Sequence, residues 1–146
     1  MLKSYPIEIA WVDSMGNSDS ILIRPEPDWT YWDAKAECVH GIAKEVLVEE
    51  GLPVTDAAER LSRALAIETV YSDAPDFDAW WVDRLFKAVK LARDFSIVDL
   101  RQLYSEIGPE ATTHFLEHVS AITPLHRAEA DARRYAEAYQ HAISTA

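Results

Sequence analysis

The sequence has little cysteine, glycine and positive charge, and each shortage excludes a class of protein. Its single cysteine, Cys38, cannot form an internal disulfide, and no second cysteine supports a zinc cluster. Only four glycines in 146 residues is typical of a globular chain rather than a disordered or fibrous one. The 14 Lys and Arg residues against 25 Asp and Glu residues give a formal net charge of −11. This balance argues against a protein that grips duplex DNA by broad phosphate neutralisation, but it does not exclude a metal-dependent nuclease.

Long hydrophobic runs are also absent. No window approaches twenty uncharged apolar residues, and the first residues lack an apolar stretch followed by a small-residue cleavage site. We therefore expect a cytoplasmic protein with no membrane partner. What the chain does contain, 49% hydrophobic and 27% charged residues in 146, predicts one packed domain over residues 1–146.

Strand-like and helix-like patterns alternate along the chain. Short runs with β-favouring side chains predict strands at residues 7–12, 20–25, 69–72 and 95–98, and the first two form a hairpin. Apolar residues at helical spacing predict helices at residues 29–40, 56–66, 80–89, 99–104, 111–119 and 124–143. Asp56 and Glu59 have capping-box spacing at the second helix, and Gly41 is expected to end the first. Strands that alternate with helices predict an α/β sheet.

The last predicted helix begins near His126 and Asp131, which are five residues apart. On a continuous helix this spacing turns the two side chains about 140° apart, so both can serve one site only if His126 lies on the loop before the helix. Pro124 is consistent with that start. In such a layout Asp131 can hold a metal ion while His126 accepts a proton from attacking water. The competing interpretation is an exposed His and Asp on an amphipathic helix.

Carboxylates crowd the end of the strand at residues 69–72. Asp73, Asp76 and Asp78 occupy the junction between this strand and the next helix, and ligand groups of open α/β sheets collect at such strand ends. The alternative is N-capping, in which Asp76 or Asp78 satisfies free backbone N–H groups of the helix.

His40-Gly41-Ile42 follows an acidic segment rich in tryptophan. By itself this tripeptide is typical of a helix C-cap with a solvated histidine. Tryptophans near the candidate segments either stack on single-stranded bases or pack helices on the sheet. These tryptophans are Trp29, Trp32, Trp80 and Trp81.

In this order the segments resemble the DEDDh family of 3′–5′ exonucleases, which includes bacterial proofreading subunits, ribonuclease T and oligoribonuclease. Residues 5–12 (YPIEIAWV) look like the family's second strand and residues 22–25 (LIRP) like its third. His40-Gly41-Ile42 is similar to its substrate-side loop, Phe77-Asp78 to its second acidic motif, and residues 126–131 (HRAEAD) to its histidine motif. The resemblance covers nearly the whole chain and implies a ribonuclease H-like α/β fold, a mixed sheet flanked by helices.

The resemblance also implies a function. The chain is expected to be a 3′–5′ exonuclease, a hydrolase that shortens single-stranded nucleic acid by two-metal hydrolysis with Mg²⁺ or Mn²⁺. The implied site residues are Asp78 and Asp131 as metal ligands, His126 as general base, and His40, Gly41 and Ile42 on the substrate side. Asp73 and Asp76 are alternatives to Asp78, which we prefer because the family's Asp directly follows a Phe.

The family's first motif, a central strand bearing Asp-x-Glu, should precede Tyr5 and has no counterpart in this chain. Two cations need several oxygen ligands, so Asp78 and Asp131 alone imply weak metal binding and little or no turnover. The missing strand would also leave two strand edges unpaired. We expect a truncated or misassigned start, and the alternative is a degenerate relative with rearranged pairing.

Three functions therefore compete. The first is the exonuclease. The second is a non-catalytic module that binds a nucleic-acid end or a nucleotide through His40 and the tryptophans. The third is an interaction protein whose unpaired strand edge accepts a strand from a partner chain or from a second copy in a homodimer.

Overall fold

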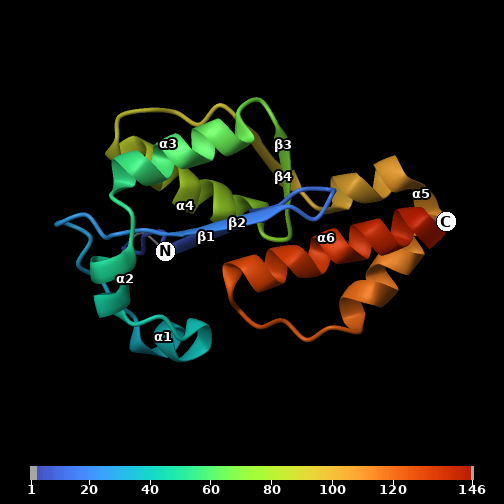
Figure 1. Ribbon diagram of the computed structural model, residues 1–146, viewed down its shortest axis with the longest axis horizontal. Coiled ribbons are helices and arrows are strands. Elements are labelled where there is room, and N and C mark those ends of the chain that lie inside the picture. Colours follow the sequence, from blue (N-terminus) through green and yellow to red (C-terminus); the bar gives the residue numbers. More distant parts are fainter. Residues whose placement is uncertain (1–2, 146) are drawn as a thin grey trace. The chain divides into compact units, whose positions relative to one another are not determined.

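The computed structural model describes residues 3–145 and has a mixed α/β fold, as the alternating patterns predict (Figure 1). Its strands are β1 (Glu8–Val12), β2 (Ser18–Leu22), β3 (Thr69–Ser72) and β4 (Ser96–Asp99). Its helices are α1 (Ala34–His40), α2 (Lys44–Glu50), α3 (Val54–Leu65), α4 (Pro75–Ala88), α5 (Arg101–Ser120) and α6 (Ala128–Thr145). None of these helices is both long enough and apolar enough to cross a membrane.

The described strands form two small sheets. β1 and β2 make the predicted antiparallel hairpin, and β3 pairs with β4 in parallel. The parallel register runs from Thr69 opposite Ser96 to Ser72 opposite Asp99. Parallel strands need a crossover connection, and α4 supplies it here. The segment from β3 to β4 is therefore a βαβ unit.

Contacts divide the chain into two compact units. Unit 1 comprises the described residues up to Glu8 together with Ile21–Leu100. Unit 2 comprises Ile9–Ser20 and the described residues from Arg101 onward. Each candidate side chain can thus be assigned to one unit.

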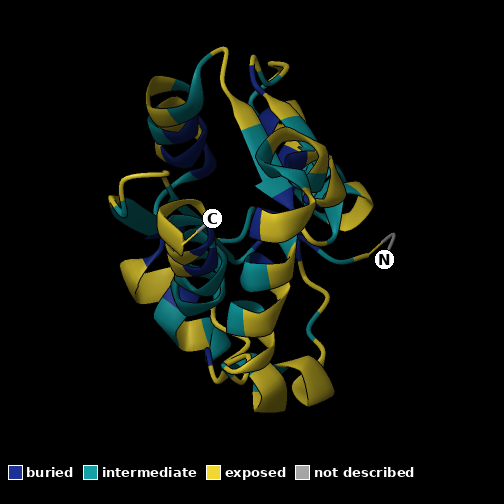
Figure 2. Cartoon of the chain, turned by 90° about the vertical axis from the view of Figure 1, so that its right-hand side faces the viewer, coloured by how far each residue is buried: buried dark blue, intermediate teal, exposed yellow. Residues whose placement is uncertain are grey.

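The core of unit 1 is built on helices whose apolar residues recur at helical spacing. Figure 2 shows the resulting change between buried and exposed residues along the helices. The phenyl ring of Phe86 on α4 meets that of Phe95 edge-on, with ring centres 6.0 Å apart. The buried residues of the two longer helices are Val54, Ala57, Ala58 and Leu61 on α3, and Val82, Leu85 and Phe86 on α4.

One glycine of unit 1 is required by a close backbone approach. The backbones of Leu22 and Arg24 exchange 2.8 Å hydrogen bonds with Leu52, the residue after Gly51. A Cβ atom on Gly51 would lie 2.3 Å from the carbonyl oxygen of Leu47 and 2.5 Å from the backbone nitrogen of Arg24. Any other residue at position 51 would push these segments apart.

Several predicted helix starts are corrected by the structure. The predicted capping box at Asp56 is wrong, because α3 begins two residues earlier, its N-cap is Pro53, and no side chain caps it. The first helix begins at Ala34 rather than at residue 29, because the side chain of Asp33 caps it by accepting the N–H of Lys35 at 2.9 Å. The sequence patterns locate helices better than they locate their ends.

Unit 2 contains the packed helices α5 and α6, which lie side by side in Figure 1. The predicted break at Gly108 and Pro109 is a kink inside α5, where Gly108 has φ 85° and ψ 170°. Beyond the kink, the rings of Phe115 on α5 and Tyr135 on α6 stack with centres 6.3 Å apart and planes 17° apart.

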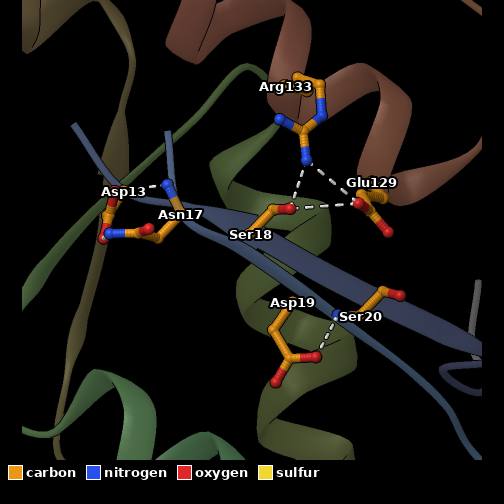
Figure 3. Close-up of polar contacts among 7 residues, drawn as sticks. All are labelled: Asp13, Asn17, Ser18, Asp19, Ser20, Glu129 and Arg133. Carbon is orange, nitrogen blue, oxygen red and sulfur yellow. Dashed lines mark hydrogen bonds and ion pairs between the residues drawn. The ribbon is translucent and has the colours of Figure 1, made fainter. Parts of the chain in front are cut away.

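Polar side chains tie the tip of the hairpin to α6 within unit 2 (Figure 3). Arg133 donates a hydrogen bond to the Ser18 hydroxyl, which donates to the Glu129 carboxylate at 3.1 Å. Arg133 and Glu129 also form an ion pair at 3.3 Å. Asp13 closes the turn of the hairpin by accepting the backbone N–H of Asn17 at 2.9 Å.

Candidate functional site

Asp78 lies in the first turn of α4, shortly after the carboxyl end of β3. Its Oδ2 atom accepts a hydrogen bond from the Ser72 hydroxyl at 2.5 Å, and Ser72 is only 8% exposed. The same Ser72 oxygen accepts the backbone N–H of Ala74 at 2.9 Å. The last residue of the strand therefore holds both the start of the helix and the carboxylate.

Burial raises the pKa of Asp78. The hydrogen bond from Ser72 acts in the opposite direction, and the negative charge of Asp73 adds to the rise in pKa. Burial disfavours the charged form of a carboxyl group, and groups held at such a cost concentrate at functional sites.

The N-capping interpretation of this junction is only partly right: Asp76 and Asp78 do lie in the first turn of α4, where the helix dipole favours negative charge, but neither is the N-cap residue. The N-cap residue of α4 is Ala74, and no side chain makes a capping hydrogen bond there. Asp76 is exposed, whereas the Asp78 carboxylate turns back to the strand. Of the two aspartates in the first turn of α4, the structure singles out Asp78.

The parallel register brings a further carboxylate to the same strand ends. Asp99, the last residue of β4, lies opposite Ser72, and the backbone N–H of Leu100 donates to the Ser72 carbonyl at 2.8 Å. The sequence pattern predicts a helix over residues 99–104, so this position of Asp99 was not predicted. The signal that could have found it is an acidic residue at the carboxyl end of the second of two parallel strands.

His126 and Asp131 lie in unit 2. His126 precedes α6, as a shared site with Asp131 requires, and adopts the left-handed backbone conformation with φ 57°. Asp131, in the early part of α6, accepts the backbone N–H of Leu125 on its Oδ1 atom at 3.1 Å. The interpretation in which both residues lie on the helix is wrong, and Asp131 fastens the loop that carries His126.

The His40 segment has the geometry of a helix C-cap. Gly41 follows α1 with φ 71° and donates its N–H to the carbonyl of Glu37 at 2.8 Å. The Nδ1 atom of His40 accepts the N–H of Ile42 at 3.0 Å, so the proton of a neutral imidazole is on Nε2. The side chain of Ile42 is buried, which leaves the imidazole of His40 as the polar group of this segment.

The tryptophans of unit 1 mostly pack against protein groups. Trp29 is buried and stacks on Tyr5 with ring centres 5.4 Å apart. The guanidinium of Arg84 lies 5.5 Å from the ring centres of both Trp29 and Trp80. The indole N–H of Trp81 donates to the hydroxyl of Ser4 at 3.1 Å. Packing is therefore the first role of this aromatic cluster.

The candidate carboxylates are the type of ligand that Mg²⁺ or Mn²⁺ prefers, but there are too few of them together to form a metal site. Hard divalent cations prefer oxygen ligands, which Asp78 and Asp131 offer. However, within residues 3–145 no group of three or more His, Cys, Asp or Glu side chains is arranged to hold a metal ion. Asp78 and His40 belong to unit 1, and Asp131 and His126 to unit 2.

Comparison of the chain with protein-family models and with curated proteins gave no match.

Proposed function

We propose that this chain is a 3′–5′ exonuclease-like protein with a ribonuclease H-like arrangement that acts on the ends of single-stranded nucleic acid. The observation that carries the proposal is Asp78, a half-buried carboxylate hydrogen-bonded to the buried Ser72 where β3 meets α4. An aspartate that served only to cap the helix would lie at its N-cap and face solvent. Asp78 does neither, and its burial raises its pKa.

Two features of the surrounding structure support this proposal. The carboxyl ends of β3 and β4, with Asp73 and Asp99, form the kind of sheet edge where α/β proteins bind ligands. His126, exposed on the loop before α6, is free to accept a proton on an imidazole nitrogen. We assign it as the general base, and His40 with Gly41 and Ile42 as the segment that contacts the terminal nucleotide.

Mg²⁺ or Mn²⁺ is the proposed cofactor, and Asp78 of unit 1 and Asp131 of unit 2 are each proposed as a protein ligand. When bound, such cations stabilise the negative charge that develops during phosphodiester hydrolysis. Two carboxylates supply fewer ligands than a pair of cations needs, so we expect weak cation binding and low turnover.

The test is the shortening of a 5′-labelled single-stranded oligonucleotide in Mn²⁺. We expect slow removal of 3′ nucleotides by the unmodified chain and none by Asp78→Asn or Asp131→Ala. Asp56→Asn is the matched control, because Asp56 is an exposed aspartate in the first turn of another helix. Equal shortening by all four proteins would mean that these carboxylates take no part, and the proposal would be wrong.

A second candidate is a binding module that recognises a nucleic-acid end or a nucleotide without cleaving it. The shortage of grouped metal ligands among residues 3–145 favours it. Fluorescence anisotropy of a labelled oligonucleotide in a metal chelator distinguishes the two candidates. Binding that weakens in His40→Ala, together with no shortening in Mn²⁺, would support the module over the nuclease.

A third candidate is a protein that accepts a β-strand from a second copy or from a partner chain. In the described part of the chain each sheet has only two strands, so every strand is an edge strand. Sedimentation analysis tests this candidate directly. A stable homodimer would support it, and a monomer that binds oligonucleotide would contradict it.

A further inference from the structure

Three of the chain's five histidines gather in unit 2, and none of the roles proposed above uses them. His114 and His118 lie on α5, and His141 lies on α6. The ring centres of His118 and His141 are 4.9 Å apart, and those of His114 and His141 are 6.4 Å apart. The cluster joins two helices that are consecutive in the chain.

Regular helix geometry puts the two histidines of α5 on one face. They are four residues apart and both lie beyond the kink at Gly108. Histidines at this spacing on a helix can bind one zinc ion together. The α5 side of the cluster is thus a two-imidazole unit with a fixed backbone.

Close packing brings the third histidine against this pair. Phe115, next to His114, is 1% exposed, and Ala138 and Ala142, on either side of His141 along α6, are fully buried. The small alanine side chains let the two helix backbones approach. His141 itself is exposed, and the other two imidazoles are half-buried, so an ion in solvent can reach all three.

The spacing of the rings is close to that of a metal site. Zinc–nitrogen bonds of about 2.0–2.1 Å place the centres of two imidazoles on one tetrahedral ion about 5 Å apart. The His118 and His141 rings already have this separation, at 4.9 Å. As the side chains stand, no three His, Cys, Asp or Glu side chains within residues 3–145 are arranged to hold a metal ion, and the His114 ring is 6.4 Å from that of His141. Binding of one ion by all three imidazoles therefore requires the half-buried His114 side chain to rotate toward His141.

We propose that His114, His118 and His141 bind one divalent transition-metal ion, with Zn²⁺ as the expected ion and solvent as the fourth ligand. Imidazole nitrogen suits Zn²⁺, Cu²⁺ and Ni²⁺, whereas Mg²⁺ prefers oxygen. The site is thus chemically distinct from the carboxylates of the proposed exonuclease function. An ion held there links α5 to α6 and stabilises unit 2 against unfolding.

The test is calorimetric titration of the full chain with ZnCl₂ in excess MgCl₂, which occupies oxygen sites. We expect one zinc ion per chain, and at least about a tenfold loss of affinity in His118→Ala and in His141→Ala, since even an indirect support of a metal ligand is worth that much. His40→Ala is the matched control, a half-buried histidine of unit 1. It should bind zinc as tightly as the unmodified chain.

Two further measurements keep the outcome decisive. Co²⁺ should give the intense visible absorption of a tetrahedral site in the unmodified chain and in His40→Ala, but not in His118→Ala/His141→Ala. Zn²⁺ should raise the unfolding temperature of the unmodified chain and of His40→Ala, but not that of His118→Ala/His141→Ala. If the alanine variants fail to fold, His141→Gln, at an exposed position, replaces them. Zinc binding that survives these substitutions, or no zinc binding at all, would overturn the proposal.

Discussion

The two aspartates proposed as metal ligands are held in different ways by the two units. Asp78 in unit 1 is half-buried beside a strand, and its carboxylate accepts a hydrogen bond from the Ser72 side chain. Asp131 in unit 2 is also half-buried, but it accepts a backbone N–H from Leu125 in the loop before its helix. Both lie in the early part of a helix, where the helix dipole favours negative charge.

This difference distinguishes an aspartate that stabilises the fold from one whose position indicates a functional role. The contact of Asp131 satisfies a loop N–H, so it contributes to stability whatever else the residue does. The position of Asp78 instead disfavours its charged form, so its ionised carboxylate is a cost that folding alone does not explain. Measurements of stability can therefore test the assignment of a functional role without any substrate.

Replacing Ser72 by alanine should have the largest effect. Replacing the buried Ser72 by alanine leaves the half-buried Asp78 carboxylate and the Ala74 N–H without their shared partner, and we expect a loss of about 1–3 kcal/mol in the free energy of unfolding. Urea unfolding at neutral pH measures it. Ser144→Ala, at an exposed serine near the end of α6, should change stability far less. Equal losses in the two variants would show that the Ser72 hydroxyl does not support Asp78.

Asp78→Asn should stabilise the protein at neutral pH, by about 0.5–2 kcal/mol, the usual gain when a costly functional group is removed. Because the pKa of Asp78 is raised on folding, its contribution to stability is fully present below the pKa of an unfolded aspartate. That contribution is lost as the pH rises through the folded pKa.

Unfolding curves across this pH range provide the check. The unmodified chain should lose stability relative to Asp78→Asn as the pH rises from acid to neutral, and the two should converge in acid. Asp76→Asn, at an exposed aspartate of the same helical turn, should follow the unmodified chain at every pH. An Asp78→Asn variant that is less stable at neutral pH would reverse our interpretation of the carboxylate.

Asp131 should respond in the opposite direction and more weakly. Asp131→Ala removes the acceptor of the Leu125 N–H, and we expect a loss of about 0.5–1 kcal/mol, as for a weak helix cap. Asp131→Asn keeps an acceptor oxygen and should be nearly neutral in thermal unfolding. The pair also separates roles in the oligonucleotide assay, because the Asn variant keeps the loop contact but lacks the charge that binds a cation. Full activity of Asp131→Asn would exclude Asp131 as a metal ligand.

Periodicity in the sequence predicts most elements of the fold because buried residues define them. The strand at residues 69–72 and the apolar spacing of α3 and α4 are examples in which local pattern and burial agree. α2 was missed because its seven residues bury only Leu47, which leaves no periodic signal. The division into units cannot be predicted from such patterns, since it depends on contacts between distant segments.

The candidate site could be predicted in part. The five-residue spacing allowed His126 and Asp131 to serve one site only if His126 preceded the helix, and His126 does precede α6. The hydrogen bond between Ser72 and Asp78 could not be predicted, because it depends on how the chain turns from β3 into α4. His114 and His118 are visible in the sequence as a pair four residues apart, but their contact with His141 depends on the packing of α5 against α6.

The smallest predicted effect concerns Glu129, a carboxylate of unit 2 whose pKa is shifted in the opposite direction to that of Asp78. Hydrogen bonds from Arg133, Ser18 and Ser20 lower the pKa of Glu129. Its contribution to stability is therefore present above the pKa of an unfolded glutamate and is lost as the pH falls through the folded pKa. Glu129→Gln should remove this loss of stability at low pH. The pH dependence of Glu129 is therefore the reverse of the one expected for Asp78.

Salt separates the two carboxylates further. The side chains of Arg133 and Glu129 are 41% and 45% exposed, so added salt should screen their ion pair and erase the difference between Glu129→Gln and the unmodified chain. Asp78 is half-buried and its pKa is raised mainly by burial rather than by a surface ion pair, so the effect of Asp78→Asn should persist in the same salt series. Unfolding curves at low and high salt would therefore distinguish a carboxylate that stabilises a surface contact from one that is kept at a cost to the fold. If salt erased both effects alike, Asp78 would be an ordinary surface charge, and the central observation behind the proposed function would be lost.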